Sequence, residues 1–259
     1  MPKKRPEGVC HICGQHGPLS FEHIPPRAAF NNRPVVTVKF AGIPLELGPD
    51  EVAKGPIQQR GMGYHTLCDK CNNDTGAWYG DQFVNWCYQG MKMLVRASGK
   101  PSLIYLNKLF PLPILKQIAT MFFSVNSEIF RIPNEEMVRF VMNKNEKYLS
   151  PKYRFFVYYN TTGRFRASGS TGLLNVNTGK ISVISEITYP PFGYVMTIAS
   201  EPPDNRLFEI THFARYDYNE FKEMPLELSV LPTHLFIPGD YREKDQIYRD
   251  AAMQPEEEN

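Results

Sequence analysis

Two CxxC pairs are the residues whose spacing most clearly indicates chemistry in this chain. One pair is Cys10 and Cys13, and the other is Cys68 and Cys71. Together they can supply four thiolates to one tetrahedral Zn²⁺, and paired knuckles of this kind rarely occur for another reason. The gap between the pairs is long for a simple zinc ribbon, so we expect further structure to be built inside it.

A carboxylate next to an imidazole, Glu22-His23, lies in that gap and is followed by Ile24-Pro25-Pro26. A histidine titrates near physiological pH and suits a general base, while a glutamate offers Mg²⁺ a hard oxygen ligand. Neighbouring strand residues point to opposite faces, so both can serve one site only if a bulge or a strand end re-aims one of them. The alternative is that Glu22 and His23 cap a turn or form local hydrogen bonds.

The order CxxC, Glu-His-Ile-x-Pro, CxxCN over about the first hundred residues resembles the HNH endonucleases, whose site is a ββα-metal motif. The resemblance implies that His23 is the general base and that Glu22 and Asn72 hold a catalytic Mg²⁺ or Mn²⁺. It also implies that the four cysteines hold a structural Zn²⁺, that the substrate is DNA, and that the setting is bacterial antiphage defence or a mobile element. Asn73 is a weaker candidate than Asn72, and an Asn here is also a common helix cap.

The match departs from the family at its middle Asn, which orients the base and usually lies shortly before the second cysteine pair. Here that stretch is Gly61-Met62-Gly63-Tyr64-His65-Thr66. His65, Gln59 or a backbone carbonyl could do the orienting instead. Two alternative functions stay open: a zinc-stabilised nucleic-acid-binding module without catalysis, and an RNase, because the metal chemistry does not itself discriminate DNA from RNA.

Composition fits a globular protein with one large domain or two. The chain has 259 residues, of which 42% are hydrophobic and 13% aromatic. Its net charge is +2, but residues 1–100 carry twelve Lys/Arg against eight Asp/Glu, and the remainder seventeen against nineteen. This bias suits phosphate binding, although a solvated basic face would look the same. Candidates to face nucleic acid are Arg27, Arg33, Lys39, Lys54 and Arg60. Without a signal peptide or a membrane-spanning run, the expected location is cytoplasmic.

The expected fold class is α+β. We expect a zinc-stabilised ββα-metal domain at residues 1–99, and at 100–259 a mixed helical and antiparallel-β accessory domain that recognises substrate, a protein partner, another copy or a signal. Asp74 or Thr75 is expected to cap a core helix over 73–98, and Asn134 a later helix beyond an apolar one at 112–127. Asn177-Thr178-Gly179 indicates a hairpin. Strands are predicted at 35–40, 154–159, 173–176, 181–187, 194–198, 207–213 and 226–231.

Several other reactive side chains are interpreted as structural. Cys87 is expected to be a small buried residue in a helix. His11 and His16 are taken as surface residues because four cysteines already complete a zinc site. His212 and His234 have no partner at metal spacing. Arg164 and Arg166 are more readily explained as solvated loop charges than as anion ligands.

Overall fold

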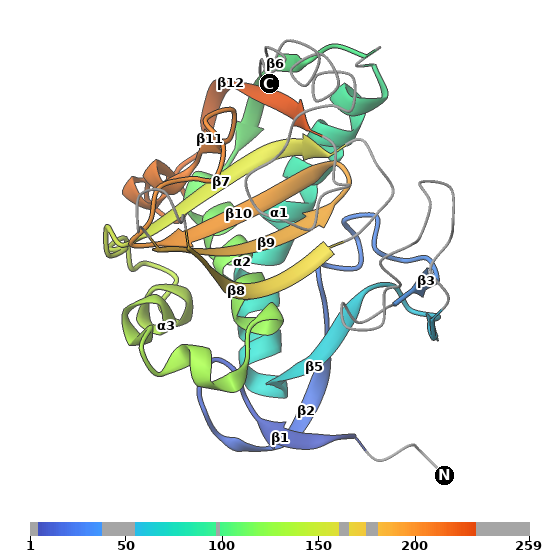
Figure 1. The fold of residues 1–259 in the computed structure, drawn as a ribbon, viewed down its shortest axis with the longest axis vertical. Helices are drawn as coiled ribbons and strands as arrows, with labels where there is room; N and C mark the ends of the chain where they lie inside the picture. Colours follow the sequence, from blue (N-terminus) through green and yellow to red (C-terminus); the bar gives the residue numbers. More distant parts are fainter. Residues whose placement is uncertain (1–4, 38–54, 97–98, 161–165, 175–180, 232–259) are drawn as a thin grey trace, which may run out of the picture.

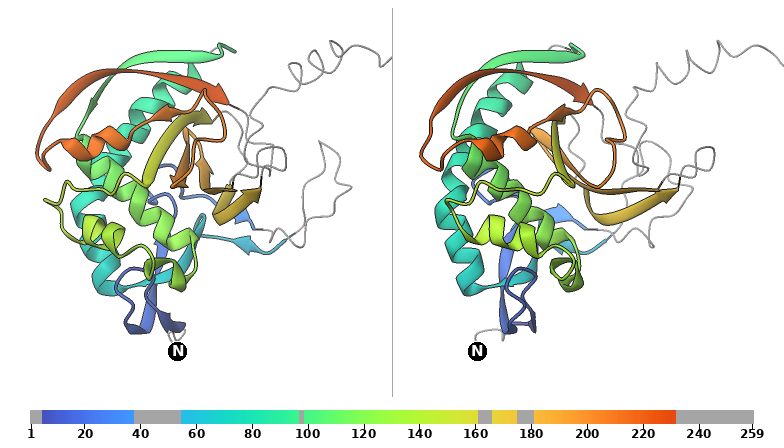
Figure 2. Two further views of the ribbon diagram at one scale, coloured as in Figure 1. Left: turned by 60° about the vertical axis from the view of Figure 1, so that its left-hand side comes forward. Right: turned by 90° about the vertical axis from the view of Figure 1, so that its left-hand side faces the viewer.

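A large mixed sheet with helices along one face forms the body of the protein (Figures 1 and 2). The computed structural model describes residues 5–37, 55–96, 99–160, 166–174 and 181–231. The sheet order is β6-β12-β7-β10-β9-β8, and β11 (Phe208–Glu209) pairs with β7. Its main strands are β6 (Ser102–Leu109), β7 (Tyr153–Asn160), β8 (Arg166–Leu174), β9 (Ile181–Tyr189), β10 (Phe192–Ile198) and β12 (Lys222–Leu231).

Most neighbours in this sheet are antiparallel, as the sequence predicted, but β12 and β7 pair in parallel. The sheet is therefore mixed. The predicted strands at 154–159, 181–187, 194–198 and 226–231 are confirmed and somewhat longer than expected. The predicted hairpin turn at 177–179 lies outside the described residues, although β8 and β9, which flank it, do pair antiparallel.

A smaller three-stranded sheet, in the order β1-β2-β5, carries the N-terminal motifs. Its strands are β1 (Glu7–Val9), β2 (His16–His23) and β5 (Gly63–Cys68). The residue after β5 begins the long helix α1 (Asp69–Val95), which therefore packs back across the sheet. In the intervening segment, β3 (Val35–Val36) pairs with β4 (Ile57–Gln58). The rest of the strand expected at 35–40 lies mostly outside the described residues.

Helix α2 (Pro111–Val125) lies between the two sheets and holds them together. All of its residues except Val125 are buried, because its sequence is mostly apolar and it packs against α1, α3 and the large sheet. Short helices follow at η2 (Glu128–Arg131), α3 (Glu135–Met142) and, later in the chain, η3 (Thr211–Arg215). One hydrophobic core runs from Cys10 to Leu228, so apolar packing is continuous across residue 100. The division at that residue stays a prediction.

Three local expectations were wrong. Helix α1 begins at Asp69 after an extended Cys68, so Asp74 and Thr75 lie inside it, and the Thr75 hydroxyl donates to the Cys71 carbonyl. Asn134 precedes α3 but forms no side-chain cap, because its amide is bonded to the Phe130 carbonyl and the Tyr153 hydroxyl.

The third error is the strand predicted at 207–213. Only Phe208–Glu209 pairs, and the chain then turns into η3, which buries Phe213 and Ala214. Apolar residues such as Phe213 and Ala214 are also typical of a strand, so composition alone does not distinguish the strand from this turn. The core helix expected over 73–98 is confirmed as helix α1: Tyr79, Phe83, Trp86 and Cys87 are buried, although Val95 at its end is exposed.

Candidate functional site: a cysteine cluster and the end of β2

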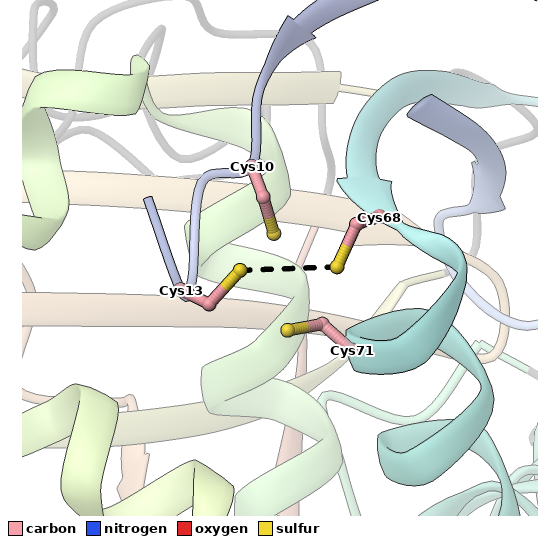
Figure 3. Close-up of side chains that lie close together, drawn as sticks. All are labelled: Cys10, Cys13, Cys68 and Cys71. Atoms are coloured by element: carbon pink, nitrogen blue, oxygen red, sulfur yellow. Dashed lines mark hydrogen bonds between the residues drawn. The ribbon is translucent and has the colours of Figure 1, made fainter. Parts of the chain in front are cut away.

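The four predicted zinc ligands come together at one point (Figure 3). Cys10 and Cys13 flank the turn between β1 and β2, Cys68 ends β5, and Cys71 lies in the first turn of α1. The four sulfur atoms all lie within 4.8 Å of one another, and those of Cys13 and Cys68 are 3.8 Å apart. Residues separated by more than fifty positions thus share one centre.

This arrangement fits a structural zinc site. Tetrahedral Zn²⁺ with bonds of about 2.3 Å to sulfur requires sulfur–sulfur separations of about 3.8 Å. Contact with the Cys71 sulfur lowers the pKa of Cys10, and the same contact, with burial, raises the pKa of Cys71. Charge on one thiol therefore opposes ionisation of its neighbour. A divalent cation would remove that conflict, because each ligand binds it as a thiolate.

The first cysteine pair is shaped by backbone hydrogen bonds and by a glycine. The Gly14 amide donates to the Cys10 carbonyl and the Cys10 amide to the Gln15 carbonyl, both at 2.9 Å. Gly14 has φ +75°, and a Cβ there would lie 2.2 Å from Cζ of Arg131, so a side chain is excluded both by conformation and by space. His11 is half-buried rather than a surface residue, and its Nδ1 lies 3.1 Å from the Phe123 carbonyl. His16 is exposed, as expected.

His23 is the last residue of β2, and its imidazole is held in place. Nε2 lies 3.0 Å from the Arg60 carbonyl oxygen. A carbonyl only accepts, so Nε2 carries the proton and Nδ1 keeps its lone pair. Burial, together with the charges of Arg27 and Arg60, lowers the pKa of His23 despite this hydrogen bond. The imidazole is therefore neutral at pH 7 and has a basic nitrogen available.

The side chain of Glu22 projects from the face of β2 opposite to that of His23. The rings of Phe21 and His23 contact each other at 4.9 Å, which places these two side chains on one face and Glu22 on the other. Glu22 lies opposite Tyr64 in the sheet. Burial raises the pKa of its carboxyl to about 8, and within the described chain no hydrogen bond or ion pair compensates for it. The pairing of β2 and β5 is irregular at Ser20/Phe21, just before Glu22.

Asn72 lies in the first turn of α1 and contacts β2. Its Nδ2 donates to the Ser20 hydroxyl at 3.0 Å and makes a long contact of 3.5 Å with the Phe21 carbonyl. Asn72 therefore contacts β2 just before Glu22 and His23, and the described chain shows no hydrogen bond from Asn72 to either of them. Asn73 is exposed.

Asn31 is a buried residue of this region that the sequence did not point to. Its Nδ2 donates to the carbonyls of Pro25 and Met62, and its Oδ1 accepts from the Met62 amide, each at 2.7 Å. The side chain thereby joins the turn after β2 to the segment before β5, which carries Arg60. It is fully buried. The only sequence signal was an Asn among prolines, which is equally typical of an exposed turn.

The alternatives for orienting the base can now be compared. The Arg60 carbonyl contacts His23, as the backbone-carbonyl alternative required. The centre of the His65 ring lies 5.3 Å from that of Phe21, and the described chain shows no hydrogen bond between His65 and His23; the Nδ1 of His65 is 3.2 Å from the Leu19 carbonyl instead. Gln59 is exposed, and the described chain shows no side-chain hydrogen bond for it.

The remaining predicted residues lie away from this region or are not described. Cys87 is buried in α1, with its sulfur 3.9 Å from the Tyr194 hydroxyl, which confirms a structural role. His212 lies in η3 between the rings of Phe208 and Phe213. Lys39, Lys54, Arg164 and His234 fall outside the described residues, as does the side chain of Arg166.

Comparison with models of protein families, with curated proteins and with solved structures yields no match for this chain. Across the described residues, no helix combines the length and the apolar character that crossing a membrane would require.

Proposed function

We propose that the protein is a metal-dependent endonuclease of the HNH type that hydrolyses phosphodiester bonds in DNA. The order of the elements supports this proposal: two antiparallel strands, β2 and β5, are followed directly by α1, and a four-cysteine cluster joins their ends. This is the strand–strand–helix order that the resemblance implies. Fold alone does not establish chemistry, so the argument depends on His23.

The geometry of the His23 imidazole carries the proposal. The Nε2–H group donates a hydrogen bond to the Arg60 carbonyl, so the imidazole presents Nδ1 as a proton acceptor in a fixed orientation. The lowered pKa keeps the ring neutral at pH 7. A fixed, neutral imidazole is what a general base needs in order to take a proton from an attacking water.

Glu22 and Asn72 are the proposed holders of Mg²⁺ or Mn²⁺, because the Glu22 carboxyl is buried near the end of β2 and Asn72 contacts Ser20 and Phe21 of the same strand. A bound divalent cation would supply charge neutralisation at the phosphate and help the departing oxygen. The Glu22 carboxyl has no compensating partner in the described chain, and a cation would stabilise its ionised form.

A second candidate is a zinc-stabilised module that binds nucleic acid without cutting it. The observation in its favour is that Glu22 and His23 project from opposite faces of β2. Cleavage at one centre would then need β2 to twist at its end so that both reach the same phosphate. RNA is a further candidate substrate for the same chemistry.

The test is cleavage of supercoiled plasmid DNA with Mg²⁺ or Mn²⁺ by wild type, His23→Ala and His16→Ala. His16 lies exposed at the other end of β2 and is the matched control. We expect wild type and His16→Ala to nick the plasmid, and His23→Ala to lose activity by roughly a hundredfold or more, the usual contribution of a general base. Zinc content must be equal in all three proteins.

The opposite outcomes are equally clear. If His23→Ala cuts as well as wild type, His23 is not the base. If wild type cuts neither plasmid nor a structured RNA but binds them, the non-catalytic module is the better description. Cleavage of RNA alone would reassign the substrate.

A further inference from the structure

Asn31 brings three exposed arginines together around the end of β2. Its amide is bonded to Pro25 and to Met62. Arg27 follows Pro25 by two residues, Arg60 precedes Met62 by two, and Arg33 follows Asn31 itself by two. Asn31 thus joins the segments that carry Arg27 and Arg60, and the charges of these two arginines both act on the His23 imidazole.

Two further contacts place these arginines. The Arg60 carbonyl accepts a hydrogen bond from His23, so the Arg60 side chain branches from the backbone next to the imidazole. Arg33 extends the group in the other direction: its charge acts on Tyr189, whose hydroxyl donates to the Phe30 carbonyl at 2.8 Å. The segment that carries the arginines is thereby attached to β9 of the large sheet.

None of the three guanidinium groups has an acidic partner in the part of the chain that the structure describes. Cations elsewhere in the N-terminal region do: Arg5 is paired with Asp69, and Lys70 with Asp74. Like charges held near one another repel, and a bound anion relieves that repulsion. A row of guanidinium groups suits phosphates in particular, because each can donate two parallel hydrogen bonds.

We propose that Arg27, Arg33 and Arg60 form a contact face for the sugar–phosphate backbone of a nucleic acid, which this face guides to His23. The inference rests on the proposed function and adds how the substrate is held. Backbone contacts position a nucleic acid but carry no sequence information. Binding at this face is therefore independent of base sequence and strongly dependent on salt.

The experiment is equilibrium binding of fluorescently labelled nucleic acid, measured by anisotropy without added Mg²⁺ so that cleavage does not interfere. The probes are two DNA duplexes of unrelated sequence and one RNA duplex. The variants are Arg27→Gln, Arg33→Gln and Arg60→Gln, alone and combined. Arg139→Gln is the matched control, since Arg139 is exposed on α3, far from β3 (Figure 1). Melting temperature and zinc content establish that each variant is folded.

We expect the association constant of wild type to fall as salt rises, with a logarithmic slope of about −0.9 per phosphate contacted. Each single variant should make the slope shallower by about one unit, and the triple variant by about three. The triple variant should also bind roughly tenfold to a hundredfold more weakly, equally for both DNA sequences, because counterion release does not depend on sequence. Arg139→Gln should match wild type.

Two results would overturn the contact face while leaving the proposed function intact: a triple variant that binds with the affinity and salt slope of wild type, or a loss confined to one DNA sequence. If wild type binds none of the three probes at low salt, both the contact face and the proposed function are overturned. Weaker binding to DNA but not to RNA by the triple variant supports the face and assigns DNA as its ligand.

Discussion

His11, although it lies between Cys10 and Cys13 of the cysteine cluster, contacts Phe123 on another element: its Nδ1 lies 3.1 Å from the Phe123 carbonyl. That carbonyl belongs to the last turn of α2, where the helix itself provides no partner. The neighbouring Asn126 side chain accepts from the Ser170 amide of β8. The first cysteine pair and the large sheet are thus attached to the same end of one helix.

This attachment predicts that zinc stabilises the whole chain and not only its first hundred residues. Wild type should hold one Zn²⁺, and Cys13→Ser, at an exposed position, should lose it. The melting temperature should then fall by more than about 10 °C, because structural zinc contributes on the order of 10 kcal/mol and each kcal/mol is worth about 2–4 °C at this size. Metal analysis and calorimetry measure both quantities.

Hydrogen exchange measures whether loss of zinc also destabilises the large sheet. In zinc-free protein, amides of β8 and β9 should lose protection together with those of β2 and β5. A zinc-free wild type with unchanged melting temperature would contradict the site, and lost protection confined to residues 5–95 would contradict the connection through α2.

Asn31→Ala should destabilise the protein by about 2–4 kcal/mol. It would leave the Met62 amide and the Pro25 carbonyl without the Asn31 side chain as partner, whereas the Met62 carbonyl would keep its hydrogen bond from the Ile24 amide. Each unsatisfied buried group costs about 1–3 kcal/mol. Asn32→Ala is the matched control, since Asn32 is exposed and such changes usually stay within about 0.5 kcal/mol. Urea unfolding of both variants measures the difference, and equal stabilities would show that Asn31 does not hold the two segments.

Two glycines of α1 should respond to alanine with opposite signs. A Cβ at Gly90 would lie 2.2 Å from the tip of the Phe192 ring, which is stacked on Trp86 at 4.4 Å and has little room to move. We expect Gly90→Ala to destabilise by about 1–3 kcal/mol. Gly80 meets nothing within 4 Å, so Gly80→Ala should stabilise by about 0.5–1 kcal/mol through helix propensity. Thermal unfolding distinguishes them, and two changes of the same sign would contradict the close packing at Gly90.

Lys116 should make stability depend on pH. It is fully buried in α2, where its Nζ donates to the carbonyls of Phe140 and Asn143. Burial lowers its pKa to about 7, against 10.5 for the free side chain, although Glu146 acts in the opposite sense. Between these values the unfolded chain binds the extra proton, so the contribution of Lys116 to stability rises with pH and is lowest below pH 7.

The measurement is the free energy of unfolding of wild type minus that of Lys116→Met, from pH 7 to 9.5. This difference should increase by up to about 1.4 kcal/mol per pH unit, since other groups cancel in the subtraction. A flat difference would mean that Lys116 keeps its ordinary pKa in the folded protein.

Local patterns in the sequence were sufficient for several features of the fold. The CxxC spacing predicted a four-sulfur centre because each pair needs only a tight turn to present two thiols. The helical spacing of apolar residues predicted α1 as a core helix, and runs of aromatic and β-branched residues predicted β7, β9 and β10, because both signals are local. Each of these patterns involves residues that are close in sequence, so it can be interpreted without the tertiary structure.

The tertiary structure decided what depends on segments that are distant in sequence. Asn31 is buried and joins two segments only because the fold brings Met62 next to it. The same approach of the two segments places the Arg60 carbonyl against His23. Helix α1 begins at Asp69, earlier than predicted, because β5 leads directly into it. Residues 207–213 form a turn and not a full strand, because the packing of Phe213 outweighs strand pairing. Glu22 and His23 were adjacent in the sequence, yet the alternation of β2 sent them to opposite faces. Spacing along a chain identifies which side chains can act, whereas the packing of strands and helices decides which of them meet.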